Sequence, residues 1–127
     1  MENHDKKIAK YGHTTLRSVL NGKELEVLVN HCTRKIWSSD AAQITDSGLG
    51  PERNTRSVYG DSVTDELLET LRPQFESVCN KALIPTYSFY RFYPKSTGLG
   101  KHTDRPACEY TVSVCLNADY SLSLIHI

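Results

Sequence analysis

The stretch that decides the fold is residues 83–117, LIPTYSFYRFYPKSTGLGKHTDRPACEYTVSVCLN. Two parts of it have the composition of β-strands. Residues 86–93 (TYSFYRFY) are dense in aromatic side chains, and residues 109–117 (EYTVSVCLN) alternate apolar with small or polar side chains. Neighbouring residues of a strand point to opposite faces, so Arg91 and Tyr93 are expected to share one face of the first strand. The Pro and Gly residues between the two parts predict a connecting loop.

Two helices are expected upstream of these strands. The first begins near Asn21, because Leu25, Leu28, Val29 and Cys32 then fall on one face at helical spacing. The spacing predicts that this face packs against the rest of the domain.

The second helix is expected to have Ser62 as its N-cap, because Ser62 with Asp65 three residues on resembles a capping box. An apolar stripe then continues at helical spacing and predicts a face packed on a sheet. Its members are Leu67, Leu68, Leu71, Phe75, Val78, Cys79 and Ala82. Pro73 lies inside the stripe, so we expect the helix to be kinked or split there.

Residues 38–62 are rich in Ser, Asp, Gly, Asn and Pro, which predicts one long loop. The order of elements is therefore helices first and strands after. That order predicts an α+β fold in which the N-terminal helices brace an antiparallel sheet.

His102 and Asp104 lie in the connection between the expected strands and are two residues apart. On an extended backbone such residues point to the same side, so an imidazole nitrogen and a carboxylate oxygen can reach one metal ion. This donor pair suits an iron site formed by two histidines and one carboxylate. The spacing alone is weak, because an exposed His and Asp in a loop also arise by chance.

Residues 83–117 as a whole resemble the core of the 2-oxoglutarate/Fe(II)-dependent oxygenase superfamily, in particular its prolyl 4-hydroxylase-like branch. Those proteins have an aromatic strand, a tyrosine nine residues before the metal-binding histidine, a His-x-Asp pair and a following strand. Here Tyr93 stands nine residues before His102. Leu99 is a departure, since prolyl hydroxylases often have an aromatic residue at that position.

The resemblance implies a fold, a reaction and ligands. The fold would be N-terminal helices bracing the first strands of an incomplete double-stranded β-helix, or jelly roll. Fe(II) would bind His102 and Asp104, the Tyr93 hydroxyl would bond the distal carboxylate of 2-oxoglutarate, and Thr111 would face the same pocket. Ascorbate is a further expected cofactor, as a reductant for the iron. The reaction would be hydroxylation of a C–H bond in a small-molecule or peptidyl substrate, with release of succinate and CO₂.

The same resemblance requires a second histidine and a later basic residue. His126 lies too close to Asp104 to be that histidine, and no basic residue follows it. Residues 122–127, LSLIHI, are also the translation of a transposon end used in sequencing libraries. We therefore expect residues 1–121 to be the N-terminal part of one oxygenase domain, residues 122–127 to be adapter-derived, and the fragment to be inactive alone.

The overall composition excludes few classes of protein. Fifteen basic residues balance fifteen acidic ones, so no nucleic-acid partner is indicated. The chain lacks an apolar run long enough for a membrane span and an apolar signal-peptide core, which predicts a soluble cytoplasmic protein. The four cysteines lack CxxC spacing and are expected to be core thiols.

Two other functions stay open. One is a non-catalytic binding module related to jelly rolls, and the other is a small α+β interaction domain whose likeness to oxygenases is accidental. Iron binding that depends on His102 would distinguish the enzyme from both.

Overall fold

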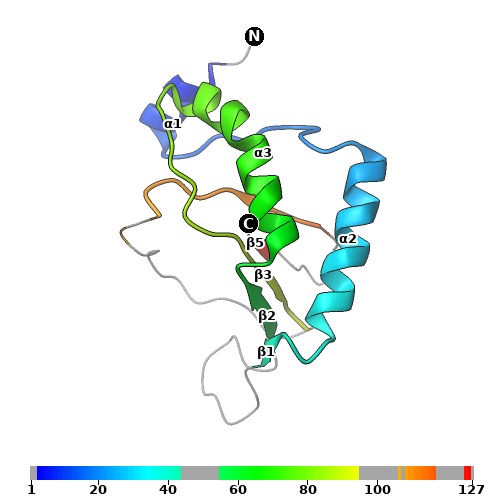
Figure 1. Ribbon diagram of the computed structural model, residues 1–127. Helices are drawn as coiled ribbons and strands as arrows, with labels where there is room; N and C mark the ends of the chain where they lie inside the picture. The colour runs from blue at the N-terminus through cyan, green and yellow to red at the C-terminus, as the bar shows by residue number, and fades with distance from the viewer. Residues whose placement is uncertain (1–2, 44–54, 95–105, 107, 117–124, 127) are drawn as a thin grey trace.

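The structure is a computed structural model that describes residues 3–43, 55–94, 106, 108–116 and 125–126. The fold is α+β, as expected. Figure 1 shows the helices α1 (His4–Tyr11), α2 (Gly22–Ile36) and α3 (Ser62–Cys79). The strands β1 (Ala42–Gln43), β2 (Arg56–Tyr59) and β3 (Phe89–Phe92) form one antiparallel sheet in the order β1-β2-β3. A separate antiparallel pair joins β4 (Ser113–Val114) to β5 (Ile125–His126).

Helix α2 confirms the expectation of a helix near Asn21. The Asn21 side chain accepts a hydrogen bond from the Glu24 backbone N–H, and the Glu24 side chain accepts one from the Asn21 backbone N–H, which is a complete capping box. Leu28, Cys32 and Ile36 recur on one face and are buried. These three side chains are the contribution of α2 to the hydrophobic core.

Strand β2 contradicts the expectation of one long loop over residues 38–62. It lies between β1 and β3, and Val58 is paired with Tyr90 across the β2–β3 ladder. Both side chains are buried, and both belong to the core cluster with α2. The strand was missed because its alternation lasts only four residues within polar surroundings.

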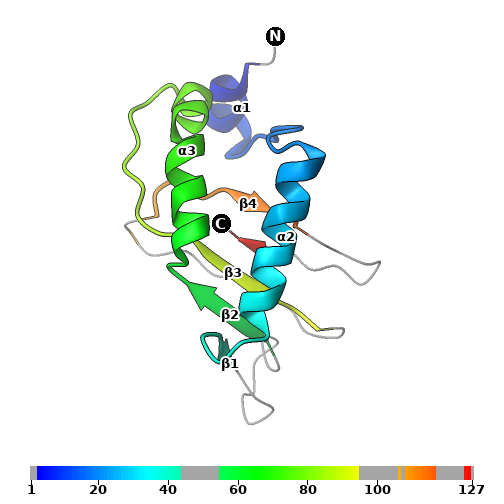
Figure 2. The ribbon, with the colours of Figure 1, turned by 45° about the vertical axis from the view of Figure 1, so that its right-hand side comes forward.

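The two faces of this sheet have different environments. Val58 and Tyr90 point toward the helices, and α2 and α3 lie side by side over that face (Figure 2). By the alternation of strands, the paired residues Ser57 and Arg91 point to the opposite face, together with Tyr93.

Arg56 ties the end of α2 to the sheet. Its guanidinium donates to the backbone carbonyl oxygens of Ile36, at 2.5 Å, and Ser38, at 3.1 Å. It also lies over the Trp37 ring, 5.2 Å from the centroid, and Trp37 contacts Phe92. A cation at the C-terminal end of a helix satisfies carbonyl groups that have no partner within the helix.

Helix α3 begins one residue earlier than the sequence indicated. Asp61, and not Ser62, is the N-cap, and its side chain accepts from the Val63 backbone N–H. Gly60 precedes it with φ +67°, a conformation that favours glycine. Asp65 does not complete a capping box but bonds Ser88 instead.

Pro73 does not split α3, which runs as one helix from Ser62 to Cys79 (Figure 1). Of the two expected alternatives, a kink or a split, the split was therefore wrong. Proline removes one backbone donor, but the turns on both sides are held by contacts outside the helix, including those of Asp61 and Phe75.

The structure differs from the expectations in two further places. Helix α1 was not expected from the sequence, and it lies against α3. The strand expected over residues 109–117 is confined to Ser113–Val114. Among the described residues, no helix combines the length and apolar character needed to cross a membrane.

Replacing Pro73 by Ala should raise the free energy of unfolding by about 1–3 kcal/mol, because alanine restores the backbone donor and removes the ring clash. Urea unfolding followed by circular dichroism measures the change. Gln74→Ala, at the neighbouring exposed position, is the control and should change stability little. No gain for Pro73→Ala would mean that the helix is already adapted to proline.

Candidate functional site

Two of the four residues expected to form the site lie within the part of the chain that the structure describes, and two lie outside it. His102 and Asp104 lie outside them. Tyr93 and Thr111 lie within them, Tyr93 buried and Thr111 exposed.

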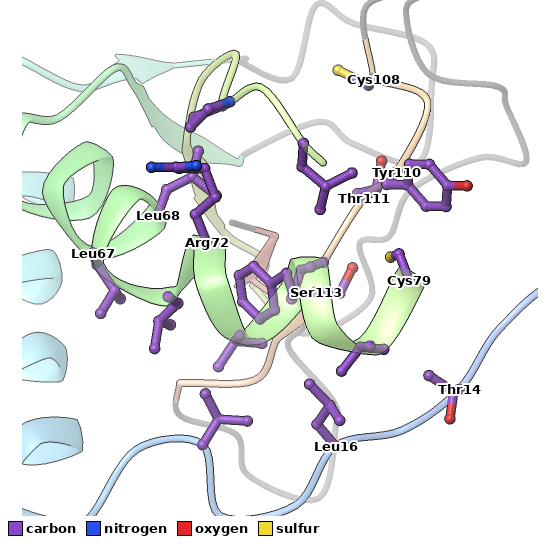
Figure 3. Close-up of a pocket in the computed structure, with 18 of the residues that line it drawn as sticks. Thr14, Leu16, Leu67, Leu68, Arg72, Cys79, Cys108, Tyr110, Thr111 and Ser113 are labelled. Carbon is purple, nitrogen blue, oxygen red and sulfur yellow. The ribbon is translucent and has the colours of Figure 1, made fainter. Parts of the chain in front are cut away.

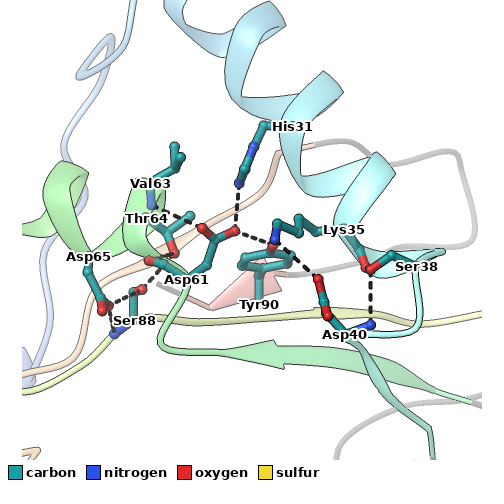
Figure 4. Close-up of polar contacts among 10 residues, drawn as sticks. All are labelled: His31, Lys35, Ser38, Asp40, Asp61, Val63, Thr64, Asp65, Ser88 and Tyr90. Carbon is teal, nitrogen blue, oxygen red and sulfur yellow. Dashed lines mark hydrogen bonds and ion pairs between the residues drawn. The ribbon is translucent and has the colours of Figure 1, made fainter.

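Asp61 is the centre of a buried polar network that the sequence did not indicate (Figure 4). Its carboxylate lies 2.6 Å from His31 Nε2 and accepts a hydrogen bond of 2.6 Å from the Tyr90 hydroxyl. The other carboxylate oxygen caps α3 through the Val63 backbone N–H. Tyr90 is fully buried, and its hydroxyl therefore needs this acceptor.

A second group of hydrogen bonds continues from the first turn of α3 to the residue before β3. Thr64 Oγ1 donates to the Asp61 backbone carbonyl and lies 2.6 Å from Ser88 Oγ. The backbone N–H and the hydroxyl of Ser88 both donate to Asp65 Oδ1. Thr64 and Ser88 are fully buried, so this group fixes α3 on the sheet.

The ionisation of Asp61 follows from its contacts. Burial by itself would raise its pKa, but the hydrogen bonds from Tyr90, Val63 and His31 outweigh burial, and the pKa is lowered. The Tyr90 pKa is raised, first by burial and then by its bond to the carboxylate. Asp61 is therefore an ionised acceptor near neutral pH.

Cys32 lies beside this network and is a poor nucleophile. Burial, and secondly the Asp61 charge, raise the pKa of its thiol to about 12. An inert thiol beside a fully bonded carboxylate has no evident chemistry. The Asp61 network is therefore a structural element that holds α2, α3 and β3 together.

On the opposite face of the sheet, buried polar groups lack hydrogen-bond partners. Three buried side-chain atoms among the described residues have no hydrogen-bond partner: Thr55 Oγ1, Arg91 Nε and Tyr93 Oη. Arg91 and Tyr93 share a face of β3, and the guanidinium lies 5.8 Å from the Tyr93 ring centroid. Native proteins rarely leave such atoms unpaired without a reason.

A cavity of about 1290 Å³ lies along the apolar face of α3 (Figure 3). Leu67, Leu68 and Phe75 line it from the helix, and Tyr110 and Thr111 line it from another segment. The apolar stripe of α3 was expected to pack on a sheet, yet most of it faces this cavity. Only Phe75 of the stripe is buried.

The cavity does not unite the expected cosubstrate residues. Thr111 lines it, whereas Tyr93 is not among its lining residues in the described part of the chain. The structure therefore does not bring Tyr93 and Thr111 into one pocket.

The residues with the most demanding environments were not predicted from the sequence. Asp61, His31 and Tyr90 come from three separate elements, and no spacing along the chain links them. The one available signal was Gly60-Asp61 before a helical pattern, which indicates a turn followed by a helix N-cap.

No family model matches the chain, and no curated protein or solved structure is significantly similar to it. Within the described ranges, no group of three or more His, Cys, Asp and Glu residues could hold a metal ion. Function is therefore inferred from the chemistry of the side chains themselves.

Replacing Tyr90 by Phe should lower the free energy of unfolding at pH 7 by about 1.5–3 kcal/mol, the range for a hydrogen bond to a charged group. Because the folded pKa of Asp61 is lowered, its contribution is present above the unfolded pKa of about 4 and is lost as the pH falls through the folded pKa. The difference between wild type and Tyr90→Phe should therefore shrink on acidification.

Urea unfolding at pH 7 and pH 3 measures this difference. Tyr11→Phe, at a position that is 60% exposed, is the matched control and should have little effect at either pH. A difference that is equally large at both pH values would mean that ionised Asp61 is not what Tyr90 stabilises.

Proposed function

We propose that this chain is part of a 2-oxoglutarate/Fe(II)-dependent oxygenase that hydroxylates a C–H bond of a small-molecule or peptidyl substrate. The observation that carries the proposal is the position and state of Tyr93. It stands nine residues before His102 in a stretch that resembles the prolyl 4-hydroxylase-like branch. Its hydroxyl is buried and has no partner among the described residues, as expected of a group that receives a polar ligand.

His102 and Asp104 are the proposed iron ligands, through one ring nitrogen and a carboxylate oxygen. Fe(II), 2-oxoglutarate and O₂, when bound, would supply the oxidant for the C–H bond: one oxygen atom of O₂ would enter the substrate and the other would enter succinate, with release of CO₂. The roles of the protein's own residues are to hold the metal, to orient the cosubstrate and to exclude water.

Tyr93 is the proposed donor to the distal carboxylate of 2-oxoglutarate. A phenol that is about nine-tenths buried donates in a region with little water, where a hydrogen bond to an anion is strong. Thr111 is a weaker candidate for the same pocket, because it lines a cavity that Tyr93 does not line.

The proposed fold of the complete domain is a double-stranded β-helix. The helices on one face of an antiparallel sheet support it, because the helices are then outside the barrel and the opposite face can contribute to a barrel interior. The cytoplasm is the proposed location, in keeping with thiol cysteines and with a site that needs ferrous iron.

Replacing His102 by Ala should weaken Fe(II) binding at least about 10-fold, because one of the few protein ligands is lost. Anaerobic titration of the full chain with Fe(II) measures the affinity. His13→Ala is the matched control and should bind iron as the wild type does. Unchanged binding in His102→Ala would exclude the oxygenase and would favour the binding module.

Replacing Tyr93 by Phe should weaken 2-oxoglutarate binding about 10-fold, the loss of one hydrogen bond to a charged group. In the absence of ligand it should not lower stability, because the hydroxyl that is removed has no partner. Calorimetric titration measures the first effect and urea unfolding the second.

Tyr90→Phe is the control for this pair of measurements. It should lower stability without changing the affinity for 2-oxoglutarate, since Tyr90 bonds Asp61 on the opposite face of β3. Loss of stability in Tyr93→Phe, with no change in affinity, would assign Tyr93 to the fold and not to the ligand.

A further inference from the structure

The cavity of about 1290 Å³ along α3 is bounded by several segments of the chain and not by the helix alone. The helix contributes Leu67, Leu71 and Val78 to its wall. Leu16, from the segment between α1 and α2, and Tyr110, from the segment before β4, line it as well (Figure 3). Side chains from three parts of the sequence therefore face one space, which distinguishes this cavity from a flat apolar surface.

The helical wall of the cavity is long and mainly apolar. Leu67, Leu71 and Val78 belong to the stripe of α3, yet each is only half-buried. The rise from Leu67 to Val78 is about 16 Å along the helix axis. The volume of the cavity also exceeds about 1000 Å³, the upper end of the usual range for small-ligand pockets. An elongated apolar ligand would therefore cover this wall and remove it from water.

The arginine on the wall is already paired with carboxylates. Of Lys, Arg, Asp and Glu, the described residues that line the cavity include only Arg72, Lys81 and Glu109. Arg72 Nη2 lies 2.8 Å from Glu69 Oε1, and Arg72 Nη1 lies 3.3 Å from Glu76 Oε1. Its positive charge is therefore compensated before any ligand binds.

The lysine on the wall is compensated by its neighbours too. Lys81 Nζ lies 5.7 Å from the centroid of the Tyr110 ring. The Lys81 pKa is raised, first by a hydrogen bond with Tyr110 and then by the Tyr110 and Glu109 charges. An ionised ligand would lose water here without gaining an uncompensated opposite charge, which costs free energy. An uncharged ligand has no such cost.

We propose that this cavity binds an uncharged ligand with a long aliphatic chain, such as a fatty alcohol. The chain would lie along the leucines of α3. Tyr110, Thr111 and Ser113 line the same cavity, and hydroxyl groups like theirs can donate to or accept from a neutral polar head. The inference does not depend on the proposed oxygenase activity, because it requires no iron ligand.

Three probes with the same twelve-carbon chain test the preference for an uncharged head. At neutral pH dodecanol is uncharged, dodecanoate is an anion and dodecylammonium is a cation. Their binding to the full chain is measured as displacement of the neutral fluorescent dye N-phenyl-naphthylamine, below the concentrations at which the probes aggregate. Dodecanol should bind at least about 10-fold more tightly than either ion, because an ionised head must be desolvated beside charges that are already paired.

Two substitutions that fill the cavity test its location. Leu71→Trp should weaken dodecanol binding at least about 10-fold, because the indole occupies space that the chain needs. Leu16→Trp, from another segment of the wall, should do the same. Val27→Trp is the matched control, since Val27 is 61% exposed on α2 and is not among the residues that line this cavity. It should bind dodecanol as the wild type does, and circular dichroism checks that each variant keeps its helices.

Binding of dodecanoate or dodecylammonium as tight as that of dodecanol would overturn the proposal. So would a wild-type chain that binds no dodecanol, or an unchanged dodecanol affinity in both cavity-filling variants. If Leu71→Trp is unfolded, Leu16→Trp decides alone. A wild-type dimer in sedimentation that Leu71→Trp dissociates would assign the cavity to a second copy of the chain and would also overturn it. Failure of the oxygenase proposal is seen separately, as iron binding that His102→Ala does not weaken.

Discussion

The rest of the structure depends on the contacts of one buried carboxylate. Asp61 receives a hydrogen bond from Tyr90 on β3, contacts His31 on α2 and caps the first turn of α3. Three elements that are distant in sequence are therefore positioned by the same side chain. An ionised group in this environment is stable only while all its partners are present, so the elements must assemble together. Arg56 has a similar but smaller role at the other end of α2.

The parts of the fold that could be predicted are those that local patterns determine. Helix α2 followed from the helical spacing of residues such as Leu28 and Cys32, and β3 followed from its aromatic alternation. Strand β2 could not be predicted, because a four-residue segment becomes a strand only through pairing on both sides. The continuity of α3 through Pro73 was likewise not evident from the local sequence.

The candidate site shows the same division. The His102 and Asp104 pair and the position of Tyr93 follow from spacing within one stretch, which a sequence displays directly. The buried state of Tyr93 and its lack of a hydrogen-bond partner could not be predicted from that spacing. The location of Thr55 on the same face as Arg91 could not be predicted either. That relation exists only through the register between β2 and β3. Thr111 was expected from the family resemblance to face a pocket with Tyr93, and the cavity that it lines does not include Tyr93.

Alternate residues of β3 point to opposite faces of the sheet and differ in whether they hold the domain together. Substitutions at Ser88 and Tyr90 disturb hydrogen bonds that hold the domain together, whereas the Tyr93 hydroxyl and the Arg91 Nε–H make no hydrogen bond within the described part of the chain. The hydrogen bonds of one face can therefore stay intact while residues of the other face change. The domain can therefore diverge in sequence on one side of its sheet without a new arrangement of the helices and core on the other side.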